Sequence, residues 1–336
     1  MKRDRHSSSR GSGSAHGGTR GFSVNAATLR KARLLVVGDA MLDRYWFGEV
    51  DRISPEAPVP IVKVERVEER PGGAANVARN AAALGAQVAL LSVIGPDEAG
   101  DRLAELVKQD GIDANLHRDE SLATTVKVRV IGRQQQLLRI DFETAPSREI
   151  LMDKLADYGR LLESCDVVIL SDYGKGGLTH IAEMIGLARK QGKHVLVDPK
   201  GDDYSRYKGA NVVTPNRSEL REVVGRWSGE EDLTARVQDL RRELGLDALL
   251  LTRSEEGMTL FEEHAVHHEA TKAREVFDVS GAGDTVIAAL AVMIGAGAGL
   301  REAMRIANHA AGIVVGKLGT AVAYPEELVS SMQAEQ

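Results

Sequence analysis

Short apolar runs recur along the chain and alternate with segments whose apolar positions repeat at helical spacing. Runs that are apolar throughout are typical of strands buried on both faces of a parallel sheet. The pattern predicts such strands at Arg33–Gly38, Gln87–Val93, Asp166–Leu170, His194–Val197, Asn211–Val213 and Ala248–Leu251, and helices at Ala99–Asp110, Leu151–Glu163, Thr179–Gln191 and Thr234–Leu244. Strands that alternate with helices in this way indicate an α/β fold with a mainly parallel sheet covered on both faces.

Three segments follow a different period. Val59–Val67, Thr124–Val130 and Gln136–Phe142 alternate apolar and polar residues with a period of two. This alternation is typical of antiparallel strands that bury one face only. We therefore expect a small second sheet, formed by strands near residues 45–67 and 124–143.

Composition narrows the class of protein. The chain has 336 residues, 43% hydrophobic and 27% charged, which is enough to bury a large core. Its net charge of −6 gives no sign of nucleic-acid binding, and its one cysteine, Cys165, rules out an internal disulfide framework. No uncharged stretch is long enough for a convincing membrane span. We expect a soluble protein of the reducing cytoplasm.

The first 25 residues differ from the rest. They are rich in Ser, Gly, Arg and His, carry a positive charge, and lack the apolar core of a secretory signal. We expect residues 1–25 to form a disordered basic tail, and the folded domain to cover about residues 30–330. Contact of the tail with nucleic acid is the weaker alternative.

The segment Asp278–Thr285 carries the clearest chemistry. Gly281, Ala282 and Gly283 precede an apolar helix, so their backbone N–H groups can converge on an anion at the helix N-terminus. A carboxylate beside such a site, Asp284, suits a general base that activates a hydroxyl for attack on a phosphoryl group. The alternative is a Gly-rich turn leading into a buried helix.

A second motif lies at Pro71–Asn80. Gly72 and Gly73 allow close approach to the backbone, and Asn76 offers both a donor and an acceptor to a sugar hydroxyl. Together the two motifs resemble those of ribokinase-like sugar kinases of the PfkB type, although Val279 stands where that family most often has Thr. The resemblance implies a three-layer α/β/α fold with a small β-lid over the sugar site, and ATP and Mg²⁺ as cofactors.

The resemblance also implies nucleotide-binding residues. Asn216 and Glu219 match the N-x-x-E element, in which the Glu acts on magnesium through water, although a capping box would have the same spacing. The turn that lies along ATP and the helix that borders the adenine would contribute Thr252, Ser254, Gly257 and Asn308.

The small β-lid implied by the resemblance leaves an apolar face, from which we expect a homodimer formed through the lid.

Charged residues near strand ends predict the sugar site. Carboxylates bind vicinal hydroxyls, and Lys and Arg bind phosphate, so we expect a substrate that already carries a phosphate group. Helix capping is the alternative for one of the two acids after the first strand, and solvated surface charge for each single base. The expected substrate-binding residues are Asp39, Asp43, Gly72, Gly73, Asn76, Arg139, Lys175, Asp198 and Lys200.

Within the family, the segment from Leu42 to Pro60 is very similar to heptose 7-phosphate kinases of lipopolysaccharide-core synthesis. The resemblance implies transfer of the γ-phosphoryl group of ATP to the anomeric O1 of D-glycero-D-manno-heptose 7-phosphate. Because the chain stops at Gln336 and contains no H-x-G-H motif, we expect the kinase alone, without a fused nucleotidyltransferase domain. A kinase of another sugar on this fold, or a sugar sensor without catalysis, are the alternatives.

Overall fold

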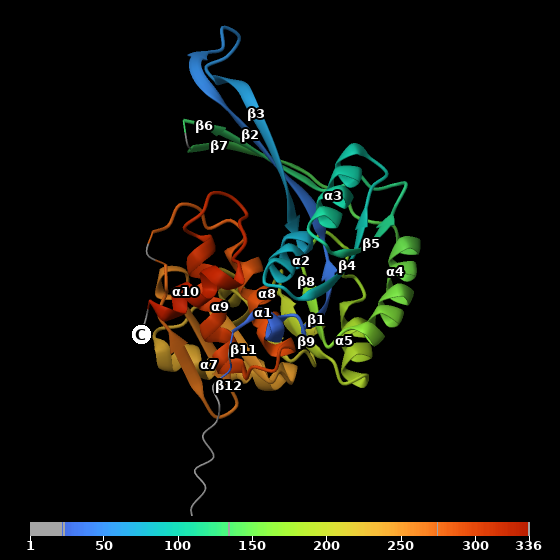
Figure 1. Cartoon of the computed structure of the whole chain (residues 1–336), viewed down its shortest axis with the longest axis vertical. Coiled ribbons are helices and arrows are strands. Elements are labelled where there is room, and N and C mark those ends of the chain that lie inside the picture. The colour runs from blue at the N-terminus through green and yellow to red at the C-terminus, as the bar shows by residue number, and fades with distance from the viewer. Residues whose placement is uncertain (1–21, 23, 134, 274, 335–336) are drawn as a thin grey trace, which may run out of the picture.

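The computed structural model describes residues 22, 24–133, 135–273 and 275–334 (Figure 1). Nearly all of the tail expected at residues 1–25 lies outside the described residues, so that expectation stays a prediction. Within the described residues, no helix is both long enough and apolar enough to cross a membrane.

The main sheet is mostly parallel, as expected. Across the described residues its nine strands run in the order β13-β12-β11-β10-β9-β8-β1-β4-β5, and only the pairs β11–β12 and β12–β13, at one edge, are antiparallel. The sequence patterns do not predict β5, β12 or β13. The strands are β1 (Arg33–Gly38), β4 (Gln87–Ile94), β5 (Asp113–Arg118), β8 (Val167–Ser171), β9 (His194–Asp198), β10 (Val212–Val213), β11 (Ala248–Thr252), β12 (Met258–Glu262) and β13 (Val266–Glu269).

Helices cover both faces of this sheet because its central strands are apolar on both sides. In β1, Leu34 and Val36 pack into one core with α2, α8 and α9, whereas Leu35 and Val37 pack into the other with α4, α5 and α7 (Figure 1). The helices are α1 (Ala26–Leu29), α2 (Ala74–Ala83), α3 (Glu98–Gln109), α4 (Arg148–Leu161), α5 (Ile181–Lys190), α6 (Arg217–Val224), α7 (Glu230–Leu244), α8 (Ala282–Gly295), α9 (Leu300–Val314) and α10 (Pro325–Gln333), with short 3-10 turns at Leu162–Ser164, Tyr204–Tyr207 and Ser254–Glu256.

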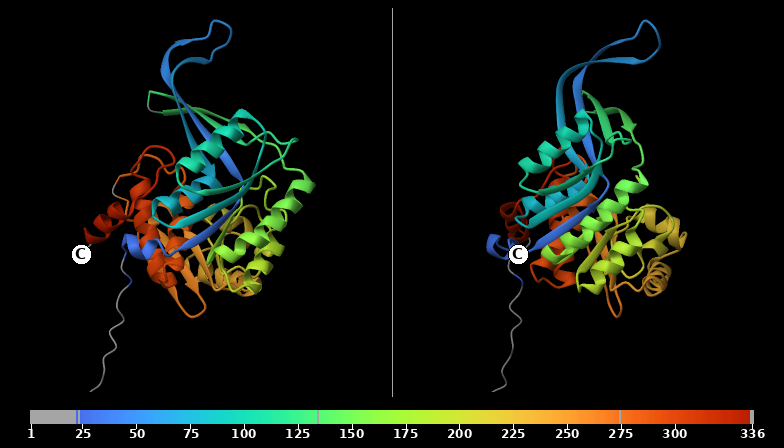
Figure 2. Two further views of the ribbon diagram at one scale, coloured as in Figure 1. Left: turned by 45° about the vertical axis from the view of Figure 1, so that its right-hand side comes forward. Right: turned by 90° about the vertical axis from the view of Figure 1, so that its right-hand side faces the viewer.

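A second sheet, here called the lid, projects from the carboxyl edge of the main sheet (Figures 1 and 2). Its strands are β2 (Ala40–Ile53), β3 (Pro60–Gly73), β6 (Val126–Gly132) and β7 (Gln135–Phe142), in the order β3-β2-β6-β7. Pairs β2–β3 and β6–β7 are antiparallel, but β2 and β6 are parallel. The expectation of antiparallel pairing was wrong for this pair, because both strands start at the main sheet and run outward.

The lid strands are also more exposed than their alternation of apolar and polar residues predicts. Only β6 alternates regularly between buried and half-buried residues. On the flanking strands, Val67, Leu138 and Phe142 are each more than half exposed. The expectation that every lid strand buries one face was therefore wrong, since α3 covers the lid only near its root.

Candidate active site

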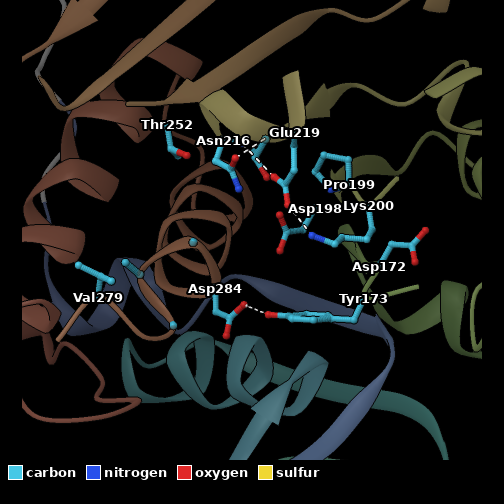
Figure 3. A pocket seen from close by; sticks show the side chains of 14 residues that line it. Asp172, Tyr173, Asp198, Pro199, Lys200, Asn216, Glu219, Thr252, Val279 and Asp284 are labelled. Atoms are coloured by element: carbon cyan, nitrogen blue, oxygen red, sulfur yellow. Dashed lines mark hydrogen bonds and ion pairs between the residues drawn. The ribbon is translucent and has the colours of Figure 1, made fainter. Parts of the chain in front are cut away.

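Asp284 lies in the first turn of α8 and is almost fully buried. The side-chain amide of Asn76 donates a hydrogen bond of 2.7 Å to its Oδ2, and the Tyr173 hydroxyl donates one to its Oδ1 (Figure 3). The two donors come from α2 and from the loop after β8, so three separate segments meet at this carboxylate. Its orientation is fixed before any ligand binds.

Burial raises the pKa of Asp284 to about 6, and the hydrogen bonds from Asn76 and Tyr173 limit the rise. The carboxylate is therefore ionised at neutral pH, yet it is a stronger base than an exposed aspartate. A pKa close to the working pH is what a general base requires.

The turn before α8 has the backbone geometry of an anion site. Gly281 adopts a φ of 76°, and a Cβ at this position would lie 2.7 Å from Nδ2 of Asn76, so only glycine fits. The N–H of Ala282 points to the carbonyl oxygen of Val279 at 3.2 Å. In the part of the chain that the structure describes, the N–H groups of Gly281 and Gly283 have no backbone acceptor outside the helix, which leaves them available to a ligand.

The two glycines before α2 serve close packing at the root of the lid. A Cβ on Gly73, whose φ is 57°, would lie 2.4 Å from the carbonyl oxygen of Asp39, and one on Gly72 would lie 2.7 Å from Oδ2 of Asp43. Asn76 is fully buried, and its Oδ1 accepts a hydrogen bond of 3.3 Å from Asn80. The Asn76 amide thus holds Asp284, where the sequence led us to expect a contact with the sugar.

A cavity of about 200 Å³ opens beside Asp284. Figure 3 shows Asp284 and Tyr173 at one end, and Asn216, Glu219 and Thr252 at the other. Its walls are formed by Asp172, Tyr173, Asp198, Pro199, Lys200, Thr214, Asn216, Glu219, Thr252, Val279, Gly281, Ala282, Gly283 and Asp284. Residues that are far apart in the sequence therefore form one site at the carboxyl edge of the sheet, as expected for this fold class.

The capping-box interpretation of Asn216 and Glu219 is confirmed, and their nucleotide-binding role stays a prediction. Asn216 caps α6, the Glu219 side chain accepts a hydrogen bond of 3.0 Å from the N–H of Asn216, and the capping box is complete. The Glu219 carboxylate also reaches the cavity, where Lys200 contacts it at 3.2 Å. Burial, with the charges of Asp284 and Glu219 nearby, raises the pKa of Asp198 well above its ordinary value.

This concentration of carboxylates fits magnesium. Asp198 and Glu219 would hold the ion, because Mg²⁺ bound with a nucleotide takes only one or two protein carboxylates and fills its remaining positions with phosphate oxygens and water. The described residues accordingly contain no group of three or more metal-ligating side chains.

Three of the expected nucleotide residues do not line this cavity. Gly257 has a φ of 91°, and a Cβ there would lie 2.1 Å from the carbonyl oxygen of Glu269, so this glycine permits the turn between β11 and β12. Ser254 lies in the same turn, with a φ of 53°. Asn308 donates a hydrogen bond of 2.6 Å to the carbonyl oxygen of Ala270 and so ties α9 to the segment before α8.

The expected sugar-binding charges separate into groups. Asp39, at the junction of β1 and β2, accepts hydrogen bonds from the N–H groups of Tyr173, Lys175 and Gly177 and so fixes the loop that carries Tyr173. No helix follows Asp39, so the capping alternative was wrong in detail, although a backbone-holding role is correct. The remaining pairs are Asp43–Arg129, Arg139–Asp141 and Lys175–Glu143 in or near the lid, and Lys200–Glu219 in the cavity.

Sequence reasoning missed several site residues. Tyr173 was visible only as part of a Gly-rich strand end, and Lys127 only as a polar position in an alternating strand. Asp172 and Thr214 also line the cavity. None of these carries a local signal, because each acquires its role from contacts with segments distant in the sequence.

Comparison with known proteins agrees with this geometry. The model of the pfkB family carbohydrate kinases matches residues 31–327. The chain is 57% identical to the D-beta-D-heptose 7-phosphate kinase of Bordetella bronchiseptica, over 90% of this chain and 97% of that protein. It is 51% identical to the bifunctional protein HldE of Shewanella amazonensis, over 93% of this chain but only 66% of that protein.

A solved structure shares the fold. Ribokinase of Arabidopsis thaliana, complexed with ribose and ATP, superposes with a TM-score of 0.73 over 90% of this chain and 99% of that one, at 21% sequence identity. The expectation of a ribokinase-like fold is confirmed. With a family model that spans nearly all of the described residues, the chain belongs to the pfkB family of carbohydrate kinases.

Proposed function

We propose that this protein transfers the γ-phosphoryl group of ATP to the anomeric O1 of D-glycero-D-manno-heptose 7-phosphate, giving the 1,7-bisphosphate. The observation that carries the chemistry is the buried carboxylate of Asp284, held by Asn76 and Tyr173 beside the turn at Gly281. The choice of sugar rests on the 57% identity to a heptose 7-phosphate kinase that is matched over almost its whole length.

The mechanism follows from the site. The sugar lies under the lid with O1 against Asp284, which accepts the proton of O1 as that oxygen attacks the γ-phosphorus in line. The available N–H groups of Gly281 and Gly283 stabilise charge on the transferred group. Lys200 lies on the nucleotide side of the cavity, where it balances the negative charge of Glu219. Magnesium, when bound by Asp198 and Glu219, offsets charge on the phosphate oxygens.

A substrate panel tests this proposal. ATP turnover is measured with Mg²⁺ and D-glycero-D-manno-heptose 7-phosphate, fructose 6-phosphate, ribose or adenosine. We expect kcat/KM to be highest for the heptose phosphate. Preference for another sugar would keep the kinase chemistry and discard the heptose assignment, and no turnover with any of them would favour a sensor.

We also propose a homodimer formed through the outer face of the lid, the face that contacts α3. Directly paired residues in a sheet share a face, and Val67, Trp46, Val130 and Leu138 form one continuous row across the four strands. The two ends of this row, Val67 and Leu138, are 53% and 55% exposed. A second lid would cover this apolar surface.

The cytoplasm is the proposed location. Both proposed substrates, ATP and a sugar phosphate, belong to that compartment. Cys165, the one cysteine of the sequence, is buried as a free thiol, which is compatible with reducing conditions.

A further inference from the structure

The inner face of the lid, which faces Asp284, is rich in charged residues. The strand register places Arg70, Asp43, Lys127 and Asp141 side by side in one row, and Glu68, Tyr45, Arg129 and Arg139 in the next. Side chains at directly paired positions point to the same side of a sheet. The face therefore presents an array of cations and carboxylates to whatever lies beneath the lid.

Most of these cations have carboxylate partners. Arg129 pairs with Asp43 at 2.6 Å, Arg139 with Asp141 at 2.9 Å, and Arg70 with Glu68 at 3.0 Å. Lys127 is different. Among the described residues its ammonium forms no hydrogen bond or ion pair, although Asp43 and Asp141 flank it in the row.

The ammonium of Lys127 lies 5.4 Å from the centroid of the Tyr173 ring. The Tyr173 hydroxyl holds the carboxylate of Asp284, so Lys127 lies over the ring that positions the proposed base. A substrate whose reacting hydroxyl meets Asp284 would extend its far end toward Lys127. Lys200, by contrast, contacts Glu219 on the nucleotide side.

Two further cations lie close to Lys127. Burial lowers the pKa of Lys127, and the charges of Lys175 and Arg139 lower it further, whereas those of Asp43 and Asp141 oppose the change. Lys175 pairs with Glu143, and Arg139 is half exposed. Lys127 and these two cations together form a cluster of three positive charges, and a dianion bound between them would relieve their mutual repulsion.

We propose that Lys127, together with Arg139 and Lys175, binds the phosphate group that the sugar substrate already carries, and so selects phosphorylated over unphosphorylated sugars. This inference rests on the proposed function, and it assigns the phosphate of the sugar to the inner face of the lid. The phosphate dianion would accept hydrogen bonds from Lys127 directly, and Arg139 would turn from Asp141 toward it. Arg129 is paired with the buried Asp43 and lies over Tyr45, so we expect it to keep its position when the phosphate binds.

Lys127→Met tests the assignment, because it keeps the aliphatic stem and removes the charge. The readout is the ratio of kcat/KM for D-glycero-D-manno-heptose 7-phosphate to kcat/KM for the same heptose without its phosphate. We expect the ratio to fall about 10- to 100-fold, the usual effect of losing a charge-assisted hydrogen bond. The KM for ATP should not change, since Lys127 lies on the sugar side.

Three companion variants sharpen the result. Lys127→Arg should restore part of the ratio, and Arg139→Gln, at a half-exposed position that does not endanger folding, should lower it. Lys108→Met, on the exposed end of α3, is the matched control and should leave it unchanged. An unaltered ratio in both Lys127→Met and Arg139→Gln would overturn the assignment.

Failure of the proposed function looks different. It would appear in the wild-type protein, as preference for a sugar phosphate other than the heptose. The same ratio would then be measured with that sugar and its unphosphorylated form. A wild-type preference for unphosphorylated sugars would overturn the phosphate site itself.

Discussion

At the scale of single residues, Asp284 is the side chain on which the proposed chemistry depends. Asp284→Asn keeps the size of the group but cannot accept the proton, so we expect kcat to fall by about 10²- to 10⁴-fold. Nucleotide affinity, measured by titration calorimetry, should change little. A variant that keeps more than about a tenth of wild-type kcat would show that another group is the base.

The pKa of Asp284 predicts the pH dependence of the reaction. The base works only when deprotonated, so activity should be present above its pKa and be lost as pH falls through about 6. The pH at which kcat/KM falls on the acid side, called the acid limb, measures the pKa of Asp284 in the free enzyme. A limb near pH 4 would mean that the carboxylate is not buried as it is here.

Tyr173→Phe provides a sharper test of the same environment. The Tyr173 hydrogen bond lowers the pKa of Asp284, so its removal should move the acid limb to higher pH, by about one unit. Tyr158→Phe is a matched control, since its buried hydroxyl bonds the carbonyl oxygen of Met184 far from the site. Equal pH profiles for the Tyr173 variant and the wild type would exclude a role for this hydroxyl at the base.

At the scale of secondary-structure elements, the lid is where the proposed homodimer can be tested. Leu138→Glu places a charge at the end of the apolar row on the outer face of the lid, so we expect the homodimer to dissociate at micromolar concentration. Light scattering after size exclusion measures the mass directly. Met152→Glu, at an exposed apolar position on α4, is the control. A Leu138→Glu protein that remains dimeric would place the interface elsewhere.

The strands also show which hydrophobic patterns predicted secondary structure correctly. The buried strands, such as Arg33–Gly38, were predicted from the sequence because a continuous apolar run has few other uses. The lid strands were found, but the parallel pairing of β2 with β6 was not, since alternation reveals a face and not a direction. The edge strands β12 and β13 were missed because no pattern separated them from the loop that follows.

At the scale of the whole molecule, nucleotide and metal should stabilise the fold together. A ligand that binds only the folded state at a hundredfold excess over its Kd adds about 2.7 kcal/mol. We expect ATP with Mg²⁺ to raise the Tm, and EDTA to remove most of the gain, because the ion proposed to be held by Asp198 and Glu219 offsets the charge of the bound phosphates. An undiminished shift in EDTA would argue against these two carboxylates as the magnesium site.

The fold class and the kind of reaction could be predicted from the amino-acid sequence, and Asp284 could be proposed as the base, because each leaves a signal in a contiguous segment. Asp278–Thr285 combines glycines, a carboxylate and the start of a helix within eight positions, and hydrophobic period alone separates main sheet from lid. Physical constraints on neighbouring residues leave such local signals. The spacing of Asn216 and Glu219 could not distinguish a helix cap from a ligand site, and the structure shows a complete cap whose two residues also line the cavity.

Which side chains contact one another could be seen only in the folded structure. It brought Tyr173 and Asn76 to Asp284, turned Asp39 into the support of a loop, and separated Lys200 from Arg139 and Lys175. It also placed Lys127 on the inner face of the lid, between Asp43 and Asp141 and over the ring of Tyr173. These facts depend on strand register and loop closure between segments far apart in the chain, and pairwise contacts of that kind leave no periodic trace in one sequence.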